Sequence, residues 1–229
     1  ILGKSGIKVS EIGFGAWTIG LDWWGKKIEE DEAKRMLKRA YDLGINFFET
    51  ADMYGKGISE KLIGQVFKGM RNEVVISTKY GYDFSKVEQI GHAELPQSFE
   101  PEFTRKALNA SLERLQTDYV DSYGMHNPKL NHIRNDATFD MFDKLIQEGK
   151  IRGWGLCNDN AYGLTACTRT AKALGVTPPC SIQGDFSLID RKSEENGVAE
   201  AASKYNENVG FMAYNALAGG MLTGKYLDM

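Results

Sequence analysis

The sequence predicts a parallel (β/α)8 barrel that lacks its last unit within these 229 residues. Short apolar runs alternate with amphipathic helical patterns along the chain, about seven strands and six helices, as in a parallel sheet with right-handed crossovers. No GxGxxG pattern follows the first strand, since Gly13-Phe14-Gly15 lacks the rest of it. A closed barrel is therefore favoured over an open doubly wound sheet. No linker divides the chain, and we expect residues 1–229 to form one domain.

The expected strands are apolar runs bounded by polar or glycine-rich segments. After a small hairpin at residues 2–10, the strands cover residues 12–18, 45–48, 74–78, 119–125, 152–156, 180–182 and 209–214. Such runs are apolar on both faces, which is typical of strands buried in a parallel sheet.

Apolar residues at helical spacing predict the helices between these strands. Asp31 is the expected N-cap of the first helix, and Gly44 ends it. The other helices are expected at residues 59–68, 107–115, 141–146, 164–174 and 198–205. The insertion at residues 81–101, which contains His92, is either a surface loop or a lid or partner contact, because loops of this length are uncommon without a role.

Composition limits the classes of partner. The net charge is −3 and the basic residues are dispersed, which argues against nucleic acid as the main partner. No apolar run is long enough for a membrane helix. The three cysteines are an odd number without CxxC spacing, so we expect a soluble protein of a reducing intracellular compartment (the cytoplasm, or an organelle such as a plastid). The histidines lack the spacing of metal ligands, so we expect no metal site.

Polar or titratable side chains stand at the end of almost every expected strand. They are Glu49 and Tyr54, Lys79, His126, Cys157 and Asn158, Gln183, and Tyr214. Each of them alone is more often structural than functional. In a barrel, however, the carboxyl ends of all strands meet at one mouth, where active sites are built. Together they form a candidate acid site.

The chemistry of this set suits carbonyl reduction with a nicotinamide cofactor. A carbonyl that accepts hydride needs a proton on its developing alkoxide, which a phenol such as Tyr54 can donate. A lysine cation stabilises the phenolate, and a carboxylate holds the ammonium. An imidazole can orient the substrate oxygen. Asn158 and Gln183 can bind a carboxamide, and the Tyr214 ring can stack on a flat heteroaromatic ring.

Five stretches then resemble the aldo-keto reductase family over almost the whole chain. They are INFFETADMYGKGISE, VVISTKYG, DYVDSYGMHNP, GKIRGWGLCN and FMAYNALAGGMLTGKY, in the family's order and spacing. The chain is most similar to the Tas-like branch, which also resembles the β subunits of voltage-gated potassium channels. The resemblance implies an NADPH-dependent reductase of an aldehyde or ketone with a (β/α)8 barrel.

The resemblance also implies residue roles. Tyr54 would be the proton donor, Lys79 would lower its pKa with help from Glu49, and His126 would orient the carbonyl. The cofactor would be held by Asn158, Gln183, Tyr214, Asn215, Leu217 and Cys157, and Trp17 would line the substrate pocket.

The sequence departs from the family pattern at Glu49, where the family has aspartate, and at Cys157, where serine is usual. We also expect the eighth strand and the segment that binds the adenosine end of NADP to be absent from these residues, either because more chain exists or because this is a truncated relative. The alternative is therefore a weak or inactive barrel that serves as a scaffold or accessory subunit with a protein partner. A Lys79 nitrogen beyond hydrogen-bond reach of Tyr54 would count against the enzyme.

Overall fold

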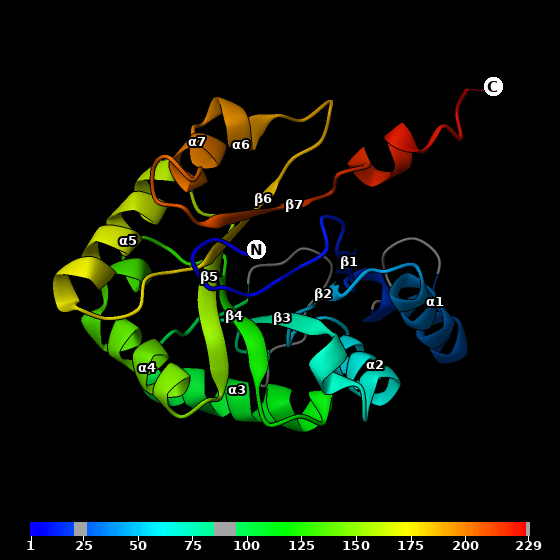
Figure 1. The fold of residues 1–229 in the computed structure, drawn as a ribbon, viewed down its shortest axis with the longest axis horizontal. Coiled ribbons are helices and arrows are strands. Elements are labelled where there is room, and N and C mark those ends of the chain that lie inside the picture. The colour runs from blue at the N-terminus through cyan, green and yellow to red at the C-terminus, as the bar shows by residue number, and fades with distance from the viewer. Residues whose placement is uncertain (21–26, 85–94, 228–229) are drawn as a thin grey trace.

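The protein, studied as a computed structural model, is described over residues 1–20, 27–84 and 95–227. Within these residues, seven parallel strands follow one another in chain order and curl into a nearly closed barrel, with the helices on its outside (Figure 1). The strands are β1 (Phe14–Gly15), β2 (Phe47–Glu49), β3 (Val75–Tyr80), β4 (Val120–His126), β5 (Ile151–Cys157), β6 (Ser181–Asp185) and β7 (Gly210–Tyr214). The predicted barrel class is confirmed.

Helices occupy the connections between consecutive strands. They are α1 (Glu30–Asp42), α2 (Ile58–Phe67), α3 (Pro101–Leu115), α4 (Asp136–Gln147), α5 (Ala161–Leu174), α6 (Lys192–Glu195) and α7 (Val198–Ala202). The helix expected at residues 198–205 is thus shorter and is preceded by a separate turn of helix. The N-cap prediction for Asp31 was wrong: the cap is Glu29, and Asp31 lies in the first turn, where its charge complements the helix dipole.

The N-terminal segment closes one end of the barrel. The turn of the expected hairpin is present at residues 2–10, held by the Leu2 N–Ile7 O hydrogen bond of 2.8 Å, but its two strands are not formed there. Leu2 and Ile7 are buried against Phe47, Val75 and Cys180, which lie at or near the beginnings of their strands. The turn therefore covers the end of the barrel opposite the strand termini that carry the polar set.

The interior of the barrel has small side chains at mid-height. Ser122 Oγ lies 3.3 Å from Ser181 Oγ, although β5 runs between their strands. This approach is open because Gly155 of β5 pairs with Ser181, and a Cβ there would lie 2.1 Å from the Ser181 hydroxyl. Likewise, Gly124 pairs with Lys79, where a Cβ would lie 3.0 Å from the lysine Cγ. The small residues leave room for one long side chain above them.

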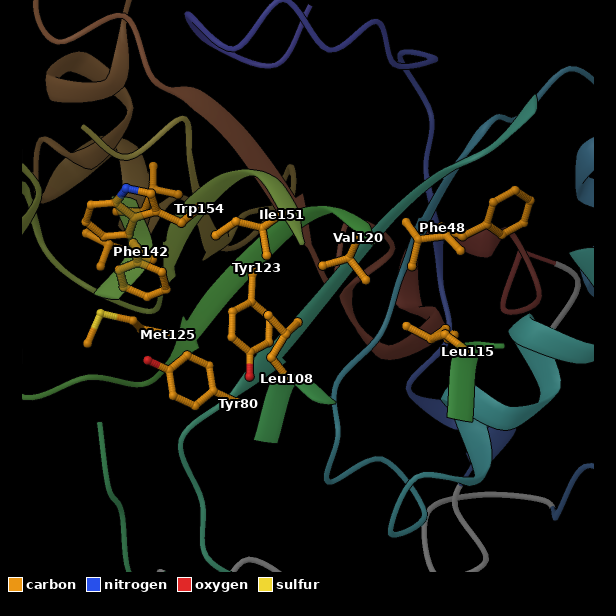
Figure 2. Close-up of a cluster of buried hydrophobic side chains, with 14 of the residues drawn as sticks. Phe48, Tyr80, Leu108, Leu115, Val120, Tyr123, Met125, Phe142, Ile151 and Trp154 are labelled. Carbon is orange, nitrogen blue, oxygen red and sulfur yellow. The ribbon is translucent and has the colours of Figure 1, made fainter. Parts of the chain in front are cut away.

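The main apolar core lies between the sheet and the outer helices (Figure 2). Tyr80 and Tyr123 stack with ring centroids 4.6 Å apart, and Phe142 of α4 stacks on Trp154 of β5 at 4.5 Å. These side chains alternate along each strand with the inward-facing ones. The core therefore fixes the strands from outside, while the inward positions remain available for polar residues.

We expect Phe142→Ala to lower the free energy of unfolding by about 3–5 kcal/mol, because it removes a buried ring and leaves a cavity beside Trp154. Leu188→Ala is the matched control, since Leu188 is 83% exposed. Urea unfolding followed by tryptophan fluorescence measures both. A loss as small for Phe142→Ala as for Leu188→Ala would contradict this core assignment.

Candidate active site

Lys79 and Glu49 form a buried ion pair inside the barrel. Lys79 Nζ contacts the Glu49 carboxylate and donates to the backbone oxygen of Thr50 at 3.0 Å. Glu49 pairs in register with Ser77, two residues before Lys79. The Glu49 side chain therefore starts one inward-facing position before Lys79 and extends toward the strand ends to reach the ammonium. Both side chains are almost fully buried, so their charges are poorly screened by water.

Tyr54 lies on the loop after β2, beside this pair. Lys79 Nζ is 4.8 Å from the centroid of the Tyr54 ring. The His126 ring meets Tyr54 edge-on, with centroids 5.9 Å apart and an angle of 84° between the ring planes. The structure thus brings together the phenol, ammonium, imidazole and carboxylate that were expected at the strand ends.

The Lys79 ammonium faces the ring of Tyr54 and not its hydroxyl. Within the described residues, the hydrogen bonds of Lys79 Nζ go to Glu49 and Thr50, and none goes to Tyr54. Because a Lys79 nitrogen without a hydrogen bond to Tyr54 was expected to count against an enzyme, this arrangement argues against turnover. Burial raises the pKa of Tyr54 well above its usual value, with smaller contributions from Cys157 and Tyr214. The phenol therefore carries its proton at neutral pH.

The protonation states of the neighbouring groups follow from burial. Burial lowers the pKa of Lys79 to about 8, while the contact with Glu49 favours the charged form. Burial, and then the positive charge of Lys79, holds the pKa of His126 well below its usual value. His126 is therefore a neutral imidazole at pH 7, and its Nδ1 has no partner among the described residues. A neutral imidazole of this kind can bind a substrate oxygen without competing for the proton of Tyr54.

Asp52 does not replace Glu49. Its side chain is buried, and within the described residues its Oδ1 has no hydrogen-bond partner. Burial, and then the charge of Glu60, raises the pKa of Asp52 well above its usual value. Burial thus disfavours the charged form of Asp52, which makes it a poorer partner than Glu49 for the Lys79 ammonium.

Amide and aromatic groups line the adjacent strand ends. Cys157 Sγ donates to Gln183 Oε1 at 3.2 Å, and the Asn158 N–H donates to the Gln183 backbone oxygen at 2.8 Å. Tyr214, at the end of β7, is 37% exposed. Burial of its phenol and the nearby Asp185 raise its pKa to about 12, against the opposing effect of a hydrogen bond with Asn158.

Three further expected residues lie in turns that follow strands. Asn215 and Leu217 are exposed in the turn after β7, where Asn215 Oδ1 accepts from the Gly219 N–H at 2.9 Å. Trp17 is half-buried in the turn after β1. The cofactor role of the first two and the pocket role of Trp17 stay predictions.

The residues present fit a nicotinamide ring. The fit rests on two side-chain amides, Asn158 and Gln183, placed beside a half-exposed aromatic ring, Tyr214. Gln183 already accepts from Cys157 through its oxygen, which leaves its nitrogen to donate. These groups would hold the carboxamide, and the ring would cover one face of a flat heterocycle.

Sequence reasoning missed three residues that touch the site. Asn127 Nδ2 donates to the Tyr82 hydroxyl at 2.6 Å, and the Tyr82 ring lies 5.2 Å from the His126 ring. Gln97 Nε2 donates to the backbone oxygens of His126 and Asn127, both at 3.0 Å. Asn127 follows β4 as Asn158 follows β5, and this parallel could have signalled it. Residues 85–94 of the insertion, with His92, lie outside the described residues.

Comparisons with known proteins give consistent matches. A family model described as "Aldo/keto reductase family" matches residues 11–229. A protein of Oryza sativa subsp. japonica, described as "Probable voltage-gated potassium channel subunit beta", is 30% identical in an alignment of 228 residues that covers 98% of this chain. The chain spans 65% of that relative, slightly less than two thirds of its length.

Solved structures agree. The holo form of aldo-keto reductase AKR11C1 from Bacillus halodurans is 31% identical with a TM-score of 0.78, and the match covers 96% of this chain and 67% of that one. The glycerol dehydrogenase AKR11B4 from Gluconobacter oxydans is 30% identical with a TM-score of 0.79, and the match covers 95% of this chain and 63% of the dehydrogenase chain. Among the described residues, no helix has the length and apolar character needed to cross a bilayer.

The backbone around Tyr54 requires glycine. Gly55 has a φ of +59°, and a Cβ there would lie 1.8 Å from the backbone oxygen of Gly20. Gly149 has a similar φ of +70°, but a Cβ there would meet nothing within 4 Å. The two positions therefore separate backbone strain from a steric clash.

We expect Gly149→Ala to cost about 1–2 kcal/mol of unfolding free energy through its left-handed backbone alone. Gly55→Ala should cost clearly more, because the loop that carries Tyr54 must also move away from Gly20. Urea unfolding compares the two variants. Equal losses would show that the loop is not packed as described.

Proposed function

The chain belongs to the aldo/keto reductase family, and from this premise we propose that it reduces an aldehyde or ketone to the alcohol with NADPH. The observation that carries the proposal is the cluster of Tyr54, Lys79 and His126 at the mouth of the barrel, supported from below by Glu49. One similar structure is described as a holo form, which supports a bound cofactor. The cofactor would supply the hydride.

Tyr54 acts as the general acid in this proposal. Its raised pKa keeps the phenol protonated, and the alkoxide of a reduced carbonyl is a much stronger base than phenolate. Proton transfer from Tyr54 is therefore favourable once negative charge develops on the substrate oxygen. The nearby Lys79 ammonium stabilises the phenolate that results, and Glu49 holds the ammonium in place.

The other side chains position the reactants. Neutral His126 binds the carbonyl oxygen and directs it toward the Tyr54 hydroxyl. Asn158 and Gln183 hold the nicotinamide carboxamide, and Tyr214 covers the ring. Orientation of this kind accounts for much of the acceleration in enzymes, because the reacting atoms no longer have to meet by diffusion.

A second candidate function is a scaffold or accessory subunit. Two observations favour it: the relative described as a potassium channel β subunit, and the absence, within the described residues, of a hydrogen bond from Lys79 to Tyr54. In this case the barrel would bind a protein partner, with or without a cofactor, and would not turn over substrate.

Tyr54→Phe should reduce the rate of NADPH consumption with a reactive aromatic aldehyde by about 10²–10⁴-fold, since it removes the proton donor. The dissociation constant for NADPH should change little. Tyr205→Phe is the control, because Tyr205 is 84% exposed. Absorbance at the NADPH band measures turnover. NADPH binding without turnover in the unmodified protein would favour the scaffold.

The rate of aldehyde reduction should fall above a pH of about 8, where Lys79 loses its positive charge. The sign follows from the lowered pKa: the ammonium is present below this pH and lost above it. No further limb is expected near pH 6.5, because His126 is already neutral there.

Glu49→Gln removes the charge that favours the ammonium, so the alkaline limb should move to lower pH. Glu49→Asp keeps the charge and serves as the matched variant. The measurement is the pH profile of kcat/KM. A limb that Glu49→Gln leaves in place would show that another group controls it.

A further inference from the structure

Two asparagines leave neighbouring strands in the same way. Asn127 follows β4 and Asn158 follows β5, with φ values of 52° and 60°. Asparagine tolerates this left-handed backbone better than most residues. Each backbone N–H donates to a backbone oxygen of the next strand, Asn127 to Cys157 at 3.2 Å and Asn158 to Gln183 at 2.8 Å. The repeated turn places the two side chains next to each other.

Their side chains form a directed hydrogen-bond chain. Asn158 Nδ2 donates to Asn127 Oδ1 at 2.7 Å, and Asn127 Nδ2 donates to the Tyr82 hydroxyl at 2.6 Å. Both ends of the Asn127 amide are therefore used. Because the nitrogen of Asn158 is engaged, its side-chain oxygen is left as the acceptor for a ligand.

The Tyr82 end of the chain is anchored. Tyr82 forms an antiparallel bridge with Gln97, whose side chain donates to the backbone oxygens of His126 and Asn127. The Tyr82 ring also packs edge-on against His126 at 5.2 Å, with 76° between the ring planes. The start and end of the β3–α3 connection are thus fastened to the end of β4, and the Tyr82 hydroxyl has a fixed position.

We propose that Tyr82 and Asn127 are positioning residues that orient the Asn158 side chain toward the carboxamide of the nicotinamide. This inference rests on the cofactor role of Asn158 in the proposed function. Without the Tyr82 hydroxyl, Asn127 Nδ2 has lost its acceptor and the amide can turn. Asn158 then no longer faces a fixed oxygen, and its own oxygen is held toward the ligand less firmly, by the hydrogen bond with Tyr214 that remains.

The test compares two ligands that differ at the carboxamide. NADP+ has an amide N–H that can donate to the Asn158 oxygen, whereas its 3-acetylpyridine analogue has a methyl group there. Isothermal titration calorimetry gives both dissociation constants, and the ratio of analogue to NADP+ reports recognition of the amide. A purely structural change would weaken both ligands together and leave the ratio unaltered.

In the unmodified protein we expect NADP+ to bind about five- to tenfold more tightly than the analogue, the effect of one hydrogen bond. Tyr82→Phe should move this ratio toward 1. Tyr119→Phe is the matched control, since it removes a hydroxyl that bonds to Asn72 away from the site. Its ratio should equal that of the unmodified protein.

Asn127→Asp supplies a second, independent test. Either carboxylate oxygen of the aspartate accepts from Asn158, so turning the group has no effect on that contact. The ratio should be retained in Asn127→Asp, and adding Tyr82→Phe to it should change the ratio no further. Circular dichroism checks that each variant folds.

The outcomes separate the two proposals. If the unmodified protein prefers NADP+ and Tyr82→Phe has the same ratio, the positioning role alone is overturned. A parent that binds both ligands equally overturns the carboxamide role of Asn158, and the positioning role with it. A parent that binds neither ligand overturns the cofactor proposal itself.

Discussion

The buried contact between Lys79 and Glu49 determines how the rest of the barrel interior is built. Removing two charges from water costs several kcal/mol per ion, about as much as their attraction returns, so such a pair adds little to stability. In this barrel the pair occupies space that small neighbouring residues leave open. Gly124 next to the lysine, and Gly155 with the two facing serines below, provide that space. The pair therefore reflects the demands of the site more than those of folding.

The same burial sets the charge of each neighbour. Lys79 carries the positive charge at the mouth, and it is one reason why His126 stays neutral beside it. Tyr54 keeps its proton because its phenolate would also be buried. The site thus holds one cation, one proton donor and one neutral acceptor or donor within a few ångströms. This combination suits a substrate that develops negative charge on oxygen.

Much of this could be predicted from sequence, for a physical reason. Strands of a parallel barrel end at one mouth, so the polar residues after them must meet, and Tyr54, Lys79 and His126 do meet. What sequence could not give was register and local turn geometry. The Tyr82–Asn127 hydrogen bond joins residues 45 positions apart, and Tyr82 also forms a bridge with Gln97. The N-terminal residues were misleading because Ile7 and Val9 alternate with polar neighbours like a strand. These two side chains and Leu2 are apolar because they pack against the end of the barrel.

Register also explains the glutamate at position 49. Seen in the sequence, the extra methylene relative to aspartate threatens to misplace the carboxylate. In the sheet, Glu49 lies opposite Ser77, one step below Lys79, and the longer side chain spans that step. Glu49 therefore preserves both the charge and the contact. The argument for a scaffold then depends less on this residue than on the Lys79–Tyr54 geometry, where the ammonium lies 4.8 Å from the ring centroid. A hydrogen bond between the Lys79 ammonium and the Tyr54 hydroxyl is the feature that would distinguish a reductase from a scaffold.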